Sequence, residues 1–198
     1  QQIQYINLFK SQGMEALILP SAIDKPFVNY LEYRGENKFT MERIDSDLSE
    51  TLKSDNETNE ELNNEFKTLF SGILSKDKLN VKVENIKDSS ISAMILLSEK
   101  ERRLMDMLET YKYDDNLKAL YGNTIVEETL ILNGNNKLIK ALEELKNKPG
   151  KEEETKLICR QVYDLALMGQ KPLTSEEMAQ FIERSNLILE KLADKETN

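Results

Sequence analysis

The strongest constraint on folding is an acidic stretch that interrupts the chain after its first quarter. Residues 45–65 carry eight Asp or Glu side chains and a single basic residue, Lys53. Such a segment cannot bury enough apolar surface to offset the entropy of ordering it. We therefore expect residues 46–58 to be a solvated linker between two units, residues 1–45 and residues 59–198. A solvated face is the ordinary explanation of such acidity, and a cation-binding role is the less favoured one.

Composition excludes several classes of function. The 198 residues include 27 Lys or Arg and 36 Asp or Glu, a formal net charge of -9, which disfavours binding to nucleic acids and to anionic membranes. Histidine is absent, so catalytic triads and zinc sites that depend on it are excluded. A single cysteine, Cys159, cannot form an internal disulfide. With no apolar run of membrane-spanning length, a reducing cytoplasmic location is expected.

The first unit has the pattern of a small α/β subdomain. Apolar residues near the amino terminus follow a helical period that ends before Gly13. The apolar run at residues 14–19, ended by Pro20, is typical of a buried strand. A second helix is expected through Phe27 and Leu31, and residues 39–44 alternate as a second strand. A right-handed crossover would make the two strands parallel.

The second unit is predicted to contain a three-stranded sheet with flanking helices. Residues 62–74 have the spacing of an amphipathic helix. Strands are expected at residues 79–86, 91–97 and 124–132. Because residues 98–122 between the last two have a helical pattern, one sheet must be assembled from non-consecutive pieces. The fold class predicted for the whole chain is therefore α+β.

The carboxyl-terminal quarter is predicted to be helical, with clear breaks. Helices are expected at residues 137–146 and 152–168, and a last one opens at Thr174 or Ser175. The apolar stripes of the last two helices, which include Met178, are wider than one packed face requires. Two copies of this helix pair would complete a four-helix bundle, so we predict self-association. A purely intramolecular helical layer is the alternative.

Candidate chemistry is sparse. No glycine-rich phosphate loop is present, and the adjacent acidic residues at 114–115 and 152–154 lie in polar runs typical of a turn and a helix start. Cys159, inside an apolar helix, is expected to be a core residue. We predict no catalytic residue and no metal site. The helix expected from Ser98 is rich in methionine and apolar side chains, which suits the binding of varied apolar partners, although the residues alone slightly favour a place in the core.

The order and spacing of several segments resemble the carboxyl-terminal part of the ninety-kilodalton heat-shock chaperones, in their bacterial branch. The opening segments, Gln4-Tyr5-Ile6, Glu15-Ala16-Leu17-Ile18-Leu19 and Ile23-Asp24, are similar to the end of the family's middle segment. The later segments, Asp88-Ser89-Ser90, Leu130-Ile131-Leu132-Asn133 and Tyr163-Asp164-Leu165-Ala166-Leu167, are similar to its dimerisation domain. Together they span nearly the whole chain.

This resemblance implies a fragment of an ATP-dependent stress-response chaperone that folds client proteins as a homodimer. The domain that binds ATP and magnesium would lie upstream of Gln1, so no cofactor and no ATPase activity are expected here. Unfolded clients, and the seventy-kilodalton chaperone system, would be partners. The client-binding residues implied by the family are Lys25, Pro26, Phe27, Asn29, Leu104, Met105, Met107, Leu108 and Tyr111. Pro26 replaces a large aromatic residue of some relatives.

The wide apolar stripes place the dimer interface on the last two helices, and the resemblance to a dimerisation domain agrees with this. Its residues are Ile158, Val162, Leu165, Met168, Phe181, Ile182, Ser185, Ile188, Leu189 and Leu192. The alternative function is a helical interaction or dimerisation adaptor for one dedicated protein partner. The two hypotheses differ in the range of clients that the apolar surfaces would bind.

Overall fold

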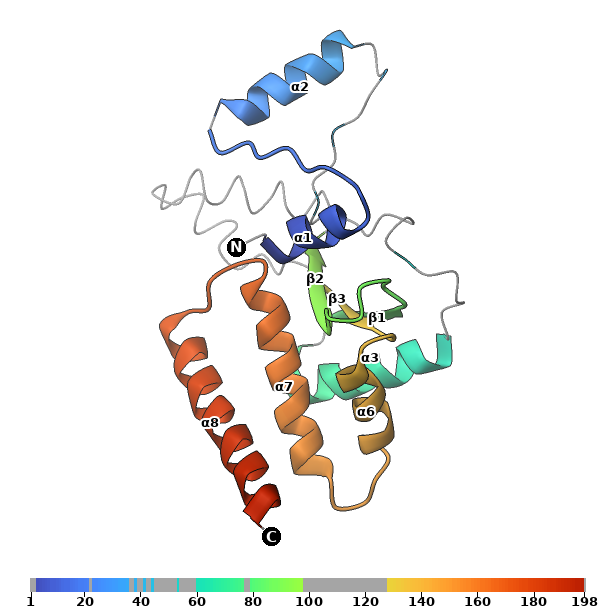
Figure 1. The fold of residues 1–198 in the computed structure, drawn as a ribbon, viewed down its shortest axis with the longest axis vertical. Coiled ribbons are helices and arrows are strands. Elements are labelled where there is room, and N and C mark those ends of the chain that lie inside the picture. Colours follow the sequence, from blue (N-terminus) through green and yellow to red (C-terminus); the bar gives the residue numbers. More distant parts are fainter. Residues whose placement is uncertain are drawn as a thin grey trace.

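The structure is a computed structural model, and it describes residues 3–21, 23–35, 38, 41, 44, 53, 60–76, 79–97 and 128–197. Within these ranges the chain forms an α+β fold built on one mixed sheet (Figure 1). Its strands are β1 (Asn80–Glu84), β2 (Ala93–Leu97) and β3 (Glu128–Asn133). The described helices are α1 (Ile3–Ser11), α2 (Asp24–Arg34), α3 (Glu60–Leu74), α6 (Lys137–Leu145), α7 (Glu152–Met168) and α8 (Ser175–Thr197).

The central strand of the sheet is β3. It pairs in parallel with β1, with Val81 opposite Leu130, and antiparallel with β2, with Ile95 opposite Leu130. The predicted assembly of one sheet from three non-consecutive segments is confirmed. A parallel pair cannot be closed by a short hairpin, so the chain makes a long excursion between β1 and β3 and uses it to add β2 on the far side.

Helices cover both faces of this sheet. On one face α3, α6 and α7 contribute Phe66, Phe70, Leu142 and Val162 to the larger core cluster. On the other face α1 contributes Tyr5 and Leu8 to a smaller cluster. The other buried members of this cluster are Ile86, Met94, Leu96 and Ile131. Burial on both faces explains why β2 and β3 are apolar at consecutive positions rather than at alternate ones.

The packing of α1 bears on the predicted division of the chain. Tyr5 is completely buried against the sheet, and its hydroxyl donates a 2.8 Å hydrogen bond to the carbonyl oxygen of Ile95. Gln170, in the turn after α7, donates to the same oxygen at 2.6 Å and to the Tyr5 hydroxyl at 3.0 Å. The first helix of the expected amino-terminal unit therefore shares a core with the carboxyl-terminal sheet, while the position of the domain boundary stays a prediction.

The predicted strand at residues 14–19 is wrong. Residues 14–20 have no regular structure, and the side chains of Leu17 and Ile18 are exposed. A strand needs a neighbour for its backbone hydrogen bonds, and none of the described strands pairs with this segment. Of the second expected strand, residues 39–44, only Met41 and Ile44 are described, so this strand lies largely outside the described residues. The predicted parallel pair is wrong because its first strand does not form.

Most of the expected linker also lies outside the described residues, but Lys53 is placed. It forms an antiparallel bridge with Ile86, and its ammonium group lies 3.8 Å from the Glu84 carboxylate. At this point the acidic stretch contacts the sheet.

The helix boundaries have local physical causes, and the start of the last helix lies where the capping residues predicted it. Asn136 caps α6 by accepting a hydrogen bond from the backbone N–H of Leu138 at 2.9 Å. Gly150, in the turn before α7, has φ +77°, a conformation that glycine adopts without strain. Thr174 and Glu177 form a reciprocal capping box at the start of α8. The backbone N–H of Thr174, donated to the Glu177 carboxylate, lowers the pKa of Glu177.

One buried side chain, Asn133, joins the end of β3 to the loop after β1. Its amide oxygen accepts from the backbone N–H groups of Ile86 and Asn135, each at 3.0 Å. Its amide nitrogen donates to the carbonyl oxygens of Asp88 at 2.9 Å and Ile91 at 2.8 Å. All of the hydrogen-bonding capacity of the Asn133 amide is used.

We expect Asn133→Ala to lower the free energy of unfolding by about 3 kcal/mol, because it leaves buried backbone groups without partners. Urea unfolding followed by circular dichroism would measure the change. Asn64→Ala, at an exposed position on α3, is the matched control and should change stability by less than about 0.5 kcal/mol. Equal effects of the two substitutions would contradict the role of the Asn133 network.

Candidate binding surfaces

The first candidate surface lies on the antiparallel pair of α7 and α8 at the carboxyl terminus (Figure 1). The inner side of α7 belongs to the sheet core through Cys159, Val162, Tyr163 and Ala166. α8 packs on α7 and makes no comparable contact with the sheet. Only part of its apolar surface is therefore covered by the same chain.

α8 exposes an apolar row, which we call the α8 stripe. Its members are separated by four, seven and three residues, which is about one or two helical turns, and so lie on one face of the helix. They are Met178, Ile182, Leu189 and Leu192, with exposed fractions of 36%, 52%, 62% and 57%. Leu165 of α7, 44% exposed, is a further uncovered apolar side chain of the pair. Single exposed apolar residues are ordinary, but a row of four along one helix is typical of an interaction site.

The predicted interface residues fall into three groups. Leu165, Ile182, Leu189 and Leu192 are exposed, as contact with a second molecule requires. Half-buried positions are Ile158, Met168, Phe181, Ser185 and Ile188. Val162 is completely buried in the core of its own chain, so its side chain cannot contact a second molecule and its assignment is corrected. An apolar helical period does not distinguish a residue packed inward from one packed on a partner.

The seam between α7 and α8 is polar, which the apolar pattern gave no reason to expect. Arg184 is almost completely buried, and its Nε donates to Gln161 at 2.9 Å. Its guanidinium also forms an ion pair with Asp164 of α7. Burial raises the pKa of Asp164, and the charge of Arg184 opposes that rise. Gln161 in turn donates to the hydroxyl oxygen of Ser185 at 3.0 Å.

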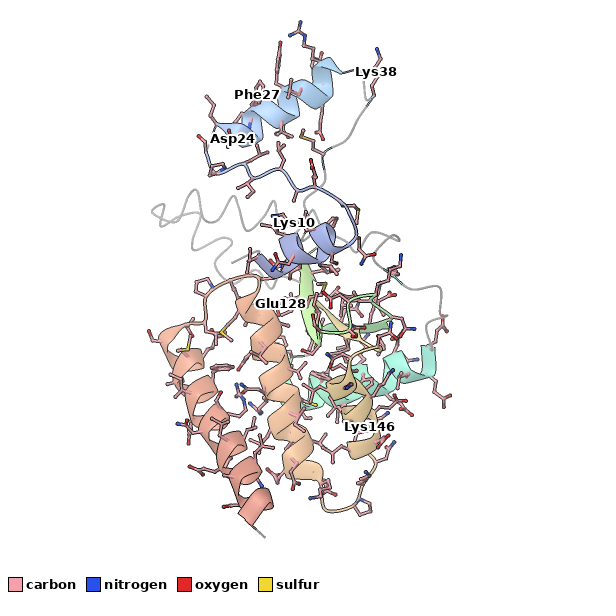
Figure 2. All side chains as sticks on the ribbon, viewed as in Figure 1. Lys10, Asp24, Phe27, Lys38, Glu128 and Lys146 are labelled. Carbon is pink, nitrogen blue, oxygen red and sulfur yellow. The ribbon has the colours of Figure 1, made fainter. Side chains whose placement is uncertain are left out.

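The second candidate surface is on α2 and the segment before it. Phe27, 56% exposed, projects from a helix that stands away from the sheet (Figure 2). Pro26 and Asn29 are exposed beside it, and the structure describes the backbone of Lys25 but not its side chain. Other large apolar side chains nearby are exposed as well. They are Leu17, Ile18, Ile23, Tyr30 and Tyr33.

The third group of predicted residues lies outside the described residues. These are Leu104, Met105, Met107, Leu108 and Tyr111, in the helix expected from Ser98. Their assignment as client-binding residues stays a prediction.

The exposed α8 stripe and the exposed α2 surface give the chain two apolar faces, and comparison with known proteins relates it to a family. A family model described as "Hsp90 protein" matches residues 1–198. The chain belongs to the Hsp90 family. Chaperone protein HtpG from Bacteroides thetaiotaomicron is 34% identical over 152 residues, which are 71% of this chain and 21% of that relative. Chaperone protein htpG from Bacteroides fragilis (strain 638R) is 29% identical over 153 residues, with the same two shares.

These matches place the chain in the bacterial HtpG branch of the Hsp90 family, as the resemblance predicted. The chain spans about a fifth of the length of these HtpG relatives. Among the described residues, no helix is long and apolar enough to cross a membrane. No three acidic or cysteine side chains in the described part of this Hsp90-family chain are grouped to hold a metal ion.

A partly buried polar cluster lies where β3 begins. The carboxylate of Glu128 (Figure 2) accepts from the Tyr163 hydroxyl at 2.5 Å and lies 3.2 Å from the Lys76 ammonium. Lys171 lies 3.9 Å from the same carboxylate. Burial, followed by the Glu128 charge, raises the pKa of Tyr163, which keeps its hydroxyl protonated as the donor. The cluster joins the turn after α3, the start of β3 and α7 of this Hsp90-family chain, and its contacts are those of a structural ion-pair network.

Cys159 is buried in the α7 side of the core, as the sequence predicted, and burial raises the pKa of its thiol to about 12. The thiolate is the reactive form, so the native thiol should be nearly inert at neutral pH. We expect Ellman's reagent to modify less than about a tenth of the protein within the time that fully modifies it in guanidinium chloride. Rapid stoichiometric reaction of the native chain would contradict this placement.

Proposed function

We propose that the chain is the dimerisation and client-binding part of an ATP-dependent HtpG-type chaperone. The observation that carries the proposal is the α8 stripe, a row of exposed apolar residues on a helix of an Hsp90-family chain. A second copy of the chain is its occupant, because two such helix pairs would bury their stripes in a four-helix bundle. Homodimerisation then brings two copies of the α2 surface into one molecule.

The proposal assigns no chemical step to this chain. Other parts of the whole protein would bind ATP and magnesium and hydrolyse ATP. The Hsp90-family match supports this, as does the fact that the chain spans only about a fifth of the length of its HtpG relatives. Cooperation with the seventy-kilodalton chaperone system and a cytoplasmic location are further parts of the proposal. None of the described residues is offered as a catalytic group.

Client binding is proposed for two surfaces. The α2 surface is supported by the exposure of Pro26, Phe27 and Asn29 together with neighbouring apolar side chains. The second surface, at Leu104, Met105, Met107, Leu108 and Tyr111, rests on family resemblance. Apolar side chains of varied shape suit unfolded clients, which share exposed hydrophobic groups rather than a sequence.

We expect Ile182→Asp to raise the dimer dissociation constant at least about 100-fold, since the dimer would then bury a charge in place of an apolar side chain. Sedimentation equilibrium would measure this constant. Leu187→Asp is the matched control, because Leu187 is 40% exposed on the same helix but lies off the stripe. A monomeric parent chain, or similar effects of the two substitutions, would contradict the proposed interface.

We expect Phe27→Ser to weaken binding of a permanently unfolded model client roughly tenfold, through loss of apolar burial. Fluorescence anisotropy with labelled client would measure the affinity. Leu138→Ser is the control, because Leu138 is 39% exposed but lies on α6, outside both proposed client surfaces. The double substitution Met105→Ser and Met107→Ser should also weaken binding.

The alternative function is an adaptor for one dedicated partner. The same binding assay separates the two hypotheses when it is repeated with several unrelated unfolded clients. A chaperone surface should bind all of them with similar affinity, whereas an adaptor should bind none of them appreciably. ATP hydrolysis by this chain alone would contradict both hypotheses.

A further inference from the structure

The contact between α7 and α8 uses directional polar groups where an apolar seam would be expected. Arg184 reaches two positions on successive turns of α7, donating from Nε to Gln161 and pairing through its guanidinium with Asp164. Its Cζ also lies 5.9 Å from the centre of the Phe181 ring on its own helix. The hydroxyl group of Ser185, next in the chain, accepts a hydrogen bond from Gln161 across the seam and donates one to the carbonyl oxygen of Phe181 on its own helix.

The apolar surface of α8 is wide enough to pack in more than one orientation. Phe181 packs on the core, whereas Ile182, the next residue, is 52% exposed in the α8 stripe. Apolar contact is non-directional, so burial alone would let α8 rotate and place part of the stripe against α7. An intramolecular helical layer of that kind would cover the surface that the proposed dimer needs.

The guanidinium group of Arg184 selects one of these orientations of α8. Arginine donates in a fixed plane, so two acceptors one turn apart on α7 define the rotation of α8 about its own axis. A buried charged pair adds little stability over apolar residues of similar volume, but a buried polar contact can specify one orientation among several. The exposures agree with such a role, since Arg184 is 8% exposed while Leu189 and Leu192 remain more than half exposed.

We propose that the seam of Gln161, Asp164 and Arg184 is a positioning device that fixes the rotation of α8 and so presents the α8 stripe to a second copy of the chain. This inference rests on the proposed dimerisation. It adds that the choice between intramolecular burial and self-association is encoded in one buried arginine and its acceptors on α7. Arg184 acts through α8 and does not itself contact the partner.

The test compares two pair substitutions in the full chain. The variant Asp164→Leu with Arg184→Met removes the buried pair without leaving an uncompensated charge. The variant Glu153→Leu with Lys156→Met is the control, because it removes an exposed ion pair of α7 with a 2.7 Å contact. Both variants lose one acidic and one basic side chain, so their net charge is equal.

Two readouts are needed. Sedimentation equilibrium gives the dimer dissociation constant. Electron spin resonance gives the distance distribution between spin labels at Glu152→Cys on α7 and Glu190→Cys on α8, both exposed positions. An excess of unlabelled chain restricts the measured distances to labels within one molecule, and the buried Cys159 should remain unlabelled. The distance distribution reports the orientation of α8, which a loss of overall stability would not alter in the folded population.

For the seam variant we expect a broadened or shifted distance distribution and a dissociation constant raised about tenfold or more, with the urea midpoint unchanged or higher. The control variant should match the parent in all three. An unchanged distance distribution in the seam variant overturns the inference, whatever happens to the dissociation constant. A monomeric parent overturns the proposed dimerisation, and the distance distribution still tests the role of the seam.

A second variant covers the case in which the double substitution does not fold. Arg184→Lys keeps the positive charge, so the chain should fold and its circular dichroism should be unchanged. It loses the planar guanidinium group that fixes the geometry of the two contacts. The distance distribution should broaden and dimer affinity should fall, both by less than in the double variant. Identity of Arg184→Lys with the parent in both readouts overturns the inference.

Discussion

The described fold depends on the pairing of β3 with a parallel strand on one side and an antiparallel strand on the other. Because β1 and β3 are parallel, the chain between them must cross the sheet, and it places β2 on the way. Helices then cover both faces, α3, α6 and α7 on one and α1 on the other. The Asn133 network fixes the end of β3, from which α6, α7 and α8 follow. The α8 stripe is exposed because the sheet has no face left to bury it.

Local periodicity predicted the helices well. The expected bounds of α3, α6 and α7 agree with the structure within two residues, and the capping residue Thr174 marked the start of α8. The strand at residues 14–19 was predicted from the same kind of signal and is wrong, because a strand depends on a distant partner that its own residues do not specify. The sequence therefore predicted individual helices better than it predicted which segments pair or pack with one another.

The candidate surfaces show the same limit. The helical period placed Val162 in the interface, although it is buried in the core against the sheet, whereas Ile182 and Leu189, which it placed there too, are exposed. Arg184 escaped notice because arginine on an amphipathic helix is usually solvated, and only the position of α7 shows that its guanidinium is buried. A wide apolar stripe does not say which of its residues pack inside the chain and which stay exposed, because that depends on how the helices are oriented.

Both outer strands of the sheet have side-chain partners on their free edges. The backbone N–H of Asn133 donates to the carbonyl oxygen of Ser92, the residue before β2. Because hydrogen-bonded and non-hydrogen-bonded pairs alternate in an antiparallel ladder, the carbonyl of Ile95 points away from β3. Tyr5 and Gln170 donate hydrogen bonds to it there. On β1 the Val83 N–H donates to Asn63 of α3 at 2.6 Å. Strand addition by a foreign polypeptide would have to displace these groups. Under the proposed client-binding function, these groups would keep the backbone of the sheet from templating the growth of aggregation-prone chains.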